Sequence, residues 1–442
     1  MAFTDLNFIV RFLPVFLVVY YICPKQLRNG ILLIGSILFC ALGDWKNAIL
    51  LLGMTVVDYV LLFVMQKRKD SQRTFVFVCL LILNIGTLLM YKFVVHRLPA
   101  GISFYTFMAV SAVIDVYRRQ AKLSDFVTFA TYLTMFPKQL QGPVVQYRDI
   151  KQELANRTYT LDRLEHGLEF FVVGLGYKVL IADTMGKLWH QVQAIGFESI
   201  STPMAWLGVL AFSMQLYFDF QGYSLMAIGV AGMLGFKFPK NFDHPYAAAT
   251  VSEYYRRWHI TLGRWFRDYV YIPLGGNRVG TGRVLFNLFV VWFLTGLWHG
   301  VTPNFLIWAG VLLLFIVLEK IFYGKFMNKH KVVSHIYIWF VIPLTWIIFA
   351  ITDLGQLGVY FTRLFPLWGT GIQVNSMDFV YYGKSYIAVV LLAFVVSLPK
   401  AEKLFMKYRD KIWMKIVLFA LFWVCAYMIA NGENNPFLYS AF

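Results

Sequence analysis

The chain alternates between long apolar runs and shorter polar or basic stretches over most of its 442 residues. A helix needs about 20 mostly apolar residues to cross a bilayer. The first run is expected to be kept in the protein, because no basic segment precedes it and no small-residue cleavage site follows. We predict membrane-spanning helices at 5–22, 31–43, 47–66, 74–91, 100–117, 165–186, 203–222, 284–300, 304–319, 333–352, 385–399 and 416–430.

Two of the connections between these runs are too long and too apolar to be plain loops. They cover 125–163 and 223–283. Irregular backbone at membrane depth persists only where protein buries it or where it lines a wet cavity. Both connections are therefore predicted to form re-entrant or interfacial segments around a functional site.

The composition indicates the same class of protein. Hydrophobic residues make up 59% of the chain and charged residues 14%, whereas ordinary soluble domains contain about 45–50% and about 25%. This excludes soluble, disordered and nucleic-acid-binding classes. The four cysteines lie in or beside apolar runs without CxxC spacing, so neither a disulfide framework nor a metal site is expected. The sequence predicts an all-α polytopic membrane protein with about 11 or 12 transmembrane helices.

The net charge of +17 is informative mainly through its distribution. Cytoplasmic loops of membrane proteins are enriched in lysine and arginine. With the N-terminus outside and about twelve crossings, 32 of the 40 basic residues fall in cytoplasmic segments and six in external loops. Both termini are therefore expected on the extracytoplasmic side.

The densest group of aromatic and charged residues occupies 250–269. At about 100° per residue, the aromatic residues fall on one face of a helix and the arginines on the other. Thr250 or Ser252 is expected to cap its start. One interpretation is an interfacial helix with its arginines in water. The other is that the arginines bind a diphosphate-bearing donor through bidentate hydrogen bonds. The candidates are Arg256, Arg257, Arg264 and Arg267.

A single histidine, His299, ends the apolar run that begins near Val284. It can be read as a hydrogen-bonded polar residue at a helix end. Ionisable groups within membranes are nevertheless functional candidates, and Gly296 and Gly300 would permit close approach of backbone or ligand. Apolar surroundings also favour the neutral imidazole that a general base needs.

The last six residues become apolar again after a polar stretch. Phe437, Leu438, Tyr439 and Phe442 follow Pro436. A free tail would seldom expose such side chains to water. The tail either anchors in the membrane interface or folds back into the protein and delivers the Tyr439 hydroxyl to the site.

Several long motifs occur in order along the chain, at 101–107, 114–118, 142–149, 218–224, 251–278 and 296–300. Together they resemble the membrane-bound O-acyltransferase family, in particular its bacterial branch of alginate and peptidoglycan O-acetyltransferases. One departure concerns the fourth motif, because relatives commonly continue Gly-Tyr-Ser with Asp, whereas Leu225 stands here. The ending 437–442 also resembles the Phe-x-Tyr-x-x-Phe ending of envelope-polymer acyltransferase systems.

The resemblance implies a bowl of helices pierced by a tunnel. It implies that His299 is the catalytic histidine and that His259 matches a second histidine, whose role is catalytic or structural. It also implies that Tyr439 carries the acyl group. By their places in the motifs, the further expected substrate- or donor-binding residues are Trp298, Tyr147, Arg148 and Asp219. The expected organisation is a single domain over 1–442, with N-terminal helices at 1–98, the family core at 99–323, and C-terminal helices and tail at 324–442.

The expected reaction moves an acyl group, acetyl in particular, from a cytoplasmic thioester to an extracytoplasmic polysaccharide. No bound cofactor is expected, and acetyl-CoA or another thioester is the donor substrate. The expected location is the bacterial inner or plasma membrane. The expected partners are the lipid bilayer, the thioester, an extracytoplasmic acetyltransferase- or esterase-like protein and the polysaccharide, with no nucleic acid.

Two alternatives remain open at this point. D-alanyl transfer to teichoic acid from a carrier-protein thioester would use the same kind of chain. A transporter of an envelope precursor would also be polytopic and basic inside, although no internal repeat of the kind common in transporters is visible.

Overall fold

The structure, a computed structural model, consists of helices joined by turns and coil. No strand occurs in the part of the chain that it describes, which confirms the predicted all-α class. Two compact units emerge from the contacts within the chain. Helix α9, Thr202–Met233, contributes residues to both, and so does α7, Leu161–Gly176, through its last two residues. The described residues are 2–95, 98–367, 375–432 and 437–438. Unit 1 is Met1–Gly174 with Tyr223–Lys240, and unit 2 is Leu175–Gly222 with Asn241–Phe442.

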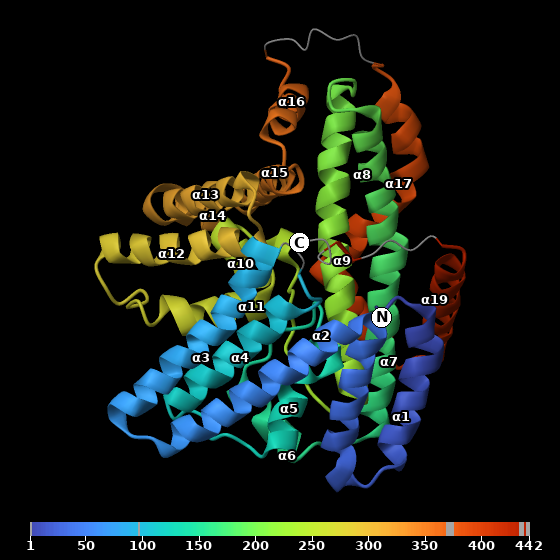
Figure 1. Cartoon of the computed structure of the whole chain (residues 1–442). Helices are drawn as coiled ribbons and strands as arrows, with labels where there is room; N and C mark the ends of the chain where they lie inside the picture. The colour runs from blue at the N-terminus through green and yellow to red at the C-terminus, as the bar shows by residue number, and fades with distance from the viewer. Residues whose placement is uncertain (1, 96–97, 368–374, 433–436, 439–442) are drawn as a thin grey trace. The chain divides into compact units, whose positions relative to one another are not determined.

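Unit 1 is built from the N-terminal helices. In Figure 1, α2, α3 and α4 are drawn in blue and cyan as neighbouring helices, in agreement with their contacts. The α-helices of this unit are α1 Leu13–Ile22, α2 Arg28–Lys67, α3 Asp70–Met90, α4 Ile102–Tyr117, α5 Phe126–Thr134, α6 Tyr147–Ala155 and α7 Leu161–Gly176. Its π- and 3-10 turns are Asn7–Phe12, Lys25–Leu27, Tyr91–Val95 and Phe136–Lys138.

The long helix α2 covers two predicted spans, 31–43 and 47–66. They meet at Asp44, whose backbone is extended (φ −155°, ψ 108°) within the otherwise helical run. The Asp44 carboxylate accepts a hydrogen bond from the Lys46 N–H at 3.0 Å. This local bond competes with the helical ladder, so the helix kinks at the polar residue between the two apolar runs.

The connection 125–163 forms two short helices, α5 and α6, with the turn Phe136–Lys138 between them. Most side chains from 129 to 147 are buried, as expected for irregular backbone that protein must cover. Phe136 packs edge-on against Phe16, with ring centroids 5.3 Å apart. This segment is therefore an interior part of unit 1.

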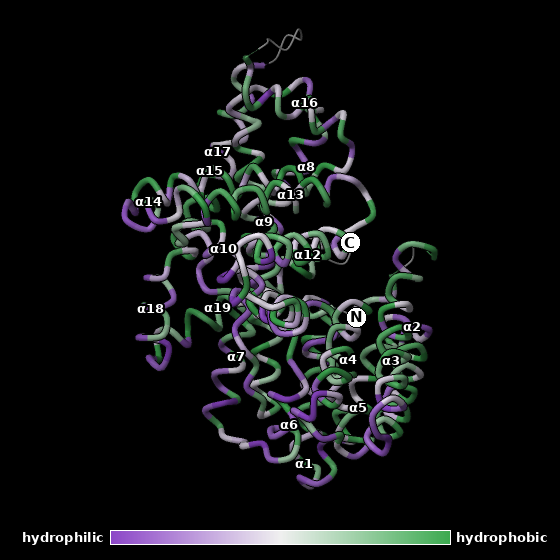
Figure 2. The backbone as a smooth tube through the Cα atoms, turned by 90° about the vertical axis from the view of Figure 1, so that its left-hand side faces the viewer, coloured by the Kyte–Doolittle hydropathy of each residue, from purple (hydrophilic) through white to green (hydrophobic). Residues whose placement is uncertain are grey.

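Unit 2 contains the remaining helices. In Figure 2, α14, Gly324–Lys329, and α18, Pro399–Tyr408, both contain purple, hydrophilic stretches. The α-helices are α8 Asp183–Ile195, α10 Val251–Arg257, α11 Ile260–Phe266, α12 Thr281–His299, α13 Pro303–Leu318, α14 Gly324–Lys329, α15 Lys331–Ala350, α16 Leu354–Leu364, α17 Asp378–Ser397, α18 Pro399–Tyr408 and α19 Ile412–Ala430. The π- and 3-10 turns are Tyr177–Ala182, Pro245–Ala247, Arg267–Tyr271 and Glu319–Tyr323.

Apart from their ends, the twelve predicted spans fall on helical residues of the structure. By length and composition, seven helical stretches in the described part of the chain are long and apolar enough to cross a membrane. Two further apolar helices, Asn7–Ile22 and Ile102–Tyr117, are shorter. The number of crossings and the side on which each end lies stay predictions. The seven stretches are Lys25–Lys67, Asp70–Val95, Thr281–His299, Pro303–Lys329, Lys331–Ala350, Asp378–Ser397 and Ile412–Ala430.

Candidate active site

The segment 250–269 does not form the single helix that the sequence predicts. Thr250 caps α10 as expected, since its side chain accepts a hydrogen bond from the Glu253 N–H at 3.1 Å. The helix then ends at Arg257, and α11 begins at Ile260. Between them His259 has φ +46°, a left-handed conformation that no residue adopts within a regular helix.

The break is held by Asn241, which comes before α10 in the chain. Its backbone carbonyl accepts the Ile260 N–H at 2.9 Å. Its side-chain oxygen accepts hydrogen bonds from the Thr261 N–H and the Thr261 hydroxyl, at 3.4 and 2.9 Å. These bonds satisfy donors at the start of α11 and stabilise a backbone turn that helix periodicity cannot reveal.

The same oxygen fixes the protonation of His259, whose Nδ1 lies 3.0 Å from Asn241 Oδ1. A backbone N–H can only donate, so the atom facing Thr261 is the amide oxygen and Nδ1 of His259 must carry the proton. Burial lowers the pKa of His259 from 6.5 to about 3, so the ring is neutral at physiological pH. The lone pair of the ring therefore resides on Nε2.

His299 is the last residue of α12, and its ring is buried in an aromatic cage. The imidazole meets Trp308 and Phe349 edge-on, at centroid separations of 5.1 and 5.0 Å. Trp298 lies 4.5 Å away on the same helix. These bulky side chains restrict the orientation of the ring and exclude water from most of its surface.

The two glycines beside His299 permit close contact between α12 and α13, which run next to each other in Figure 1. A Cβ on Gly300 would come within 2.1 Å of the Phe305 ring, and one on Gly296 within 3.0 Å of Ala309. Such separations are shorter than van der Waals contact. The sequence predicted that these glycines permit close approach of either backbone or a ligand. The structure shows close approach of a neighbouring helix.

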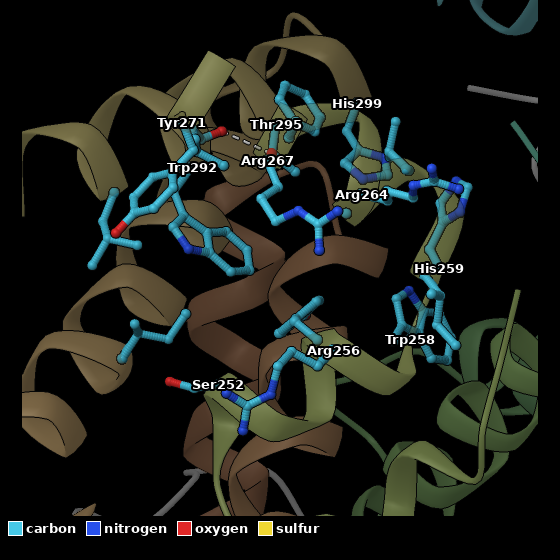
Figure 3. A pocket seen from close by; sticks show the side chains of 18 of the residues that line it. Ser252, Arg256, Trp258, His259, Arg264, Arg267, Tyr271, Trp292, Thr295 and His299 are labelled. Atoms are coloured by element: carbon cyan, nitrogen blue, oxygen red, sulfur yellow. Dashed lines mark hydrogen bonds between the residues drawn. The ribbon is translucent and has the colours of Figure 1, made fainter. Parts of the chain in front are cut away.

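A cavity of about 630 Å³ lies beside this cage and is lined by residues of α10, α11, α12, α13 and α15 and of the turn Arg267–Tyr271. It contains both His259 and His299, together with three of the four candidate arginines. Figure 3 shows the Arg267 side chain extending into the cavity and Arg256 approaching it from α10. The arginines that line it are Arg256, Arg264 and Arg267.

A buried carboxylate holds two of these arginines. Asp268 lies 2.8 Å from Nε of Arg267 and 3.6 Å from Nε of Arg264. Each contact uses only one edge of a guanidinium, which has five N–H donors. The lining thus combines three positive groups and two imidazoles with an otherwise mostly apolar wall that includes Trp292, Trp308 and Trp346.

Other predicted residues lie outside the cavity lining. Arg257 donates to the Glu253 carboxylate at 3.0 and 2.7 Å and to the Asp243 carbonyl. Trp298 contacts the His299 ring without lining the cavity. Asp219 pairs with Lys178 at 2.8 Å.

Tyr147 and Arg148 belong to unit 1 rather than to unit 2. The Tyr147 hydroxyl accepts the Ser124 N–H at 2.9 Å, and Arg148 donates to Gln120 at 3.1 Å. Both contacts are typical of side chains that stabilise their own surroundings. Tyr439 lies outside the described residues.

Sequence reasoning did not single out several residues of this site. Asn241 and Asp268 act through hydrogen bonds whose geometry no spacing predicts. Tyr271, Trp292 and Thr295 also line the cavity. Tyr271 lies in the connection 223–283, which was predicted to surround a functional site, and in the motif 251–278. Trp292 and Thr295 lie in the predicted span 284–300, shortly before His299.

One group of side chains in the described part of the chain has ligand atoms close enough for a metal ion, namely Asp243, His244 and Glu402, within 4.8 Å of one another. His244 Nδ1 lies 3.0 Å from the Ser397 carbonyl oxygen and Nε2 lies 2.7 Å from the Glu402 carboxylate. Both neighbours accept, so both nitrogens donate, and the Glu402 hydrogen bond raises the pKa of His244. The geometry favours an ion pair over a metal site, since a doubly protonated imidazole has no lone pair for a metal.

Comparison with known proteins identifies the class of this chain. The model of the MBOAT, membrane-bound O-acyltransferase family, matches residues 87–354. The chain is 34% identical to the probable alginate O-acetylase AlgI of Pseudomonas fluorescens, covering 86% of this chain and 81% of the relative. It is 30% identical to the peptidoglycan O-acetyltransferase of Helicobacter pylori, with coverages of 74% and 70%. It is also 29% identical to the teichoic acid D-alanyltransferase of Streptococcus thermophilus, with coverages of 66% and 76%.

The chain belongs to the membrane-bound O-acyltransferase family. It is accordingly a multi-pass membrane enzyme that transfers acyl groups to oxygen, which confirms the predicted family and enzyme class and sets the transporter alternative aside. The matched range contains the whole cavity lining, including both histidines.

Proposed function

We propose that this enzyme transfers an acetyl group from a cytoplasmic thioester, such as acetyl-CoA, for O-acetylation of a cell-envelope or secreted polysaccharide. The observation that carries the proposal is that His299 and three arginines line one cavity. The names of the alginate and peptidoglycan relatives support acetyl as the group and a polysaccharide as the final acceptor.

His299 is proposed as the general base of the transfer. The neutral imidazole takes the proton of an attacking hydroxyl, whose oxygen forms a bond to the thioester carbonyl carbon. The carbon–sulfur bond then breaks, and the imidazolium returns the proton to the leaving thiolate. A thioester is already activated, so the protein mainly supplies orientation and proton transfer, the latter contributing typically about 10²–10⁴-fold.

Arg256, Arg264 and Arg267 are proposed to hold the donor's phosphates. Guanidinium groups bind phosphate through paired hydrogen bonds. The Asp268 carboxylate lies against Nε of Arg264 and of Arg267 and helps to orient both side chains. The basic segments around the cavity belong to the side that the charge distribution assigns to the cytoplasm, which is where the donor is expected.

Tyr439 is proposed to carry the acetyl group between donor and acceptor. Its phenol oxygen would attack the thioester first, with loss of its proton to His299, and form an aryl ester. A hydroxyl of the polysaccharide, or of an extracytoplasmic partner enzyme, would then attack that ester and restore the phenol. A relay of this kind fits a donor inside the cell and a polymer outside it.

Release of free thiol from acetyl-CoA tests the role of His299. We expect the wild-type enzyme in detergent to release thiol and His299→Ala to be slower by about 10²–10⁴-fold, as for loss of a positioned base. His190→Ala, which changes an exposed histidine on α8, is the matched control. Undiminished release by His299→Ala would remove that residue from its role, and release only from a D-alanyl carrier thioester would reassign the donor.

A further inference from the structure

Unit 2 contains a buried ion cluster that the proposed transfer does not use. Lys178 lies in the π-helix Tyr177–Ala182, and its Nζ is 2.7 Å from Asp183 and 2.8 Å from Asp219. All three side chains are no more than 2% exposed. A π-helix adds a residue to the helical turn and frequently marks a functional position.

The cluster combines two carboxylates with one ammonium group. Burying charge is tolerated only where the groups are paired and their remaining hydrogen-bonding capacity is used. By formal charge, the carboxylates exceed the ammonium by one. A further donor directed at one of them would therefore stabilise the cluster.

The C-terminal segment supplies such a donor to Asp219. The Leu438 N–H donates to Asp219 Oδ2 at 3.0 Å, while Lys178 binds the other carboxylate oxygen. Phe437 is buried, and its ring centroid lies 4.7 Å from the Lys178 Nζ, within the range of a cation–π interaction. Leu438 packs against the hydrophobic core of unit 2.

Two consecutive residues thus hold this segment through three contacts, two with the ion cluster and one with the hydrophobic core. One contact is a hydrogen bond from the backbone to a charged acceptor, the second involves the aromatic ring and the ammonium, and the third is apolar packing. The backbone bond is independent of side-chain identity and fixes the path of the chain. The side-chain contacts select an aromatic residue followed by an aliphatic one.

We propose that Lys178 and Asp219 form a docking site for the enzyme's own C-terminal segment. Asp219 is a positioning residue in this scheme, which reassigns it from the donor to the tail. It holds the backbone one residue before Tyr439. For the acyl relay, this reduces the conformational freedom that must be lost when the tyrosine reacts. That consequence rests on the proposed function, whereas the docking itself does not.

Two matched variants separate the docking site from the rest of the cluster. Asp219→Ala and Asp183→Ala each remove one of the two carboxylates that pair with Lys178 and keep the other, so the formal charges balance in both. Only Asp219→Ala removes the acceptor for the Leu438 N–H. We expect hydrogen exchange of the peptide containing residues 437–438 to become about 10- to 100-fold faster in Asp219→Ala, as for loss of a hydrogen bond to a charged group. In Asp183→Ala it should stay within about twofold of the wild type, since that bond is retained.

Phe437→Ala gives a second measurement that leaves the buried cluster intact, should Asp219→Ala fail to fold. It removes the ring next to Lys178, and we expect the same peptide to exchange faster. Unchanged exchange in Phe437→Ala or in folded Asp219→Ala would overturn the docking site, and so would equal acceleration in the two aspartate variants. Hydrogen exchange is measured without substrate, so it tests docking separately from acyl transfer. A C-terminal segment that is protected from exchange but whose Tyr439 is never acylated would contradict the relay and leave the docking site standing.

Discussion

Asn241 holds the ring of His259 in one orientation, with its side-chain oxygen 3.0 Å from Nδ1. The same oxygen accepts two hydrogen bonds from Thr261. The left-handed turn, the tautomer of the histidine and the start of α11 therefore depend on one amide. Since α10 and α11 both supply arginines to the cavity, this contact links the backbone turn to the charge arrangement of the site.

The neutral state of His259 predicts a pH dependence of stability. Burial lowers the pKa of His259 to about 3 from 6.5. The unfolded chain therefore binds this proton below about pH 6.5, whereas the folded protein binds it only near pH 3. The contribution of the neutral His259 ring to the free energy of unfolding should be fully present above pH 6.5. It should decrease at lower pH, by at most about 1.4 kcal/mol per pH unit. Thermal unfolding in detergent at pH 5.0 and 7.5 measures the difference.

His259→Gln should reduce this loss between pH 7.5 and 5.0, because glutamine does not titrate. His190→Gln, which changes an exposed histidine, should leave it unchanged. An identical pH dependence in the wild type and in His259→Gln would show that His259 does not contribute in this way.

The arginines of the cavity should affect binding of the thioester more than the chemical step. We expect Arg256→Gln, Arg264→Gln and Arg267→Gln each to raise the KM for acetyl-CoA by about 3- to 30-fold with a smaller change in kcat, as for loss of uniform binding. The effect of Arg257→Gln should be smaller, since its guanidinium is bonded to Glu253. Initial rates over a range of acetyl-CoA concentrations measure both constants.

Arg283→Gln provides the control for a general loss of positive charge. Arg283 lies at the start of α12, outside the cavity lining, and donates to the Leu274 carbonyl. A KM raised equally by Arg283→Gln would mean that the arginines act through net charge and not through a defined binding site.

The contact between α12 and α13 should tolerate no side chain at Gly300. A Cβ there would come within 2.1 Å of the Phe305 ring, so Gly300→Ala must displace that ring, which stacks near His299 at a centroid separation of 6.2 Å, or the backbone beside it. We expect a loss of about 1–3 kcal/mol of stability, as for overpacking, together with reduced activity. Gly310→Ala, with open space around its Cβ on α13, should be neutral or slightly stabilising. Equal melting temperatures for the two variants would contradict this packing.

The relay makes a prediction for Tyr439, which lies outside the described residues. Tyr439→Phe removes only the hydroxyl, so we expect normal expression and membrane insertion but no acetylation of the polymer in cells. Chemical release and quantification of polymer acetate measures this. Wild-type acetylation in the variant would eliminate the relay while leaving direct transfer to the polysaccharide open.

The positions of the helices could be predicted because apolar length is a strong local signal. The polar gap at 44–46 predicted a loop between two separate spans, whereas the structure joins both spans into one helix that kinks at Asp44. The break at His259 could not be predicted in the same way. A regular helix over 250–269 is compatible with the pattern of aromatic and basic residues, and the left-handed turn is stabilised by Asn241, which lies outside that window.

The candidate site was predictable in its residues and less so in its arrangement. The motif positions of His299 and His259 pointed to two residues that line one cavity. The sequence predicted donor binding equally for Arg256 and Arg257. In the structure Arg257 pairs with Glu253, whereas Arg256 lines the cavity. That difference depends on where α10 ends, and adjacent residues on a helix point in different directions. Which of them reaches a ligand is decided by the three-dimensional fold.

Mass spectrometry after incubation of the purified enzyme with labelled acetyl-CoA shows whether the acetyl group reaches the C-terminal segment in a step that needs His299. We predict that the label reaches Tyr439 in the C-terminal peptide of the wild-type enzyme, and that His299→Ala stays unlabelled despite an unchanged melting temperature. An equally labelled C-terminal peptide in folded His299→Ala would contradict this prediction, because acyl transfer would then proceed without the imidazole.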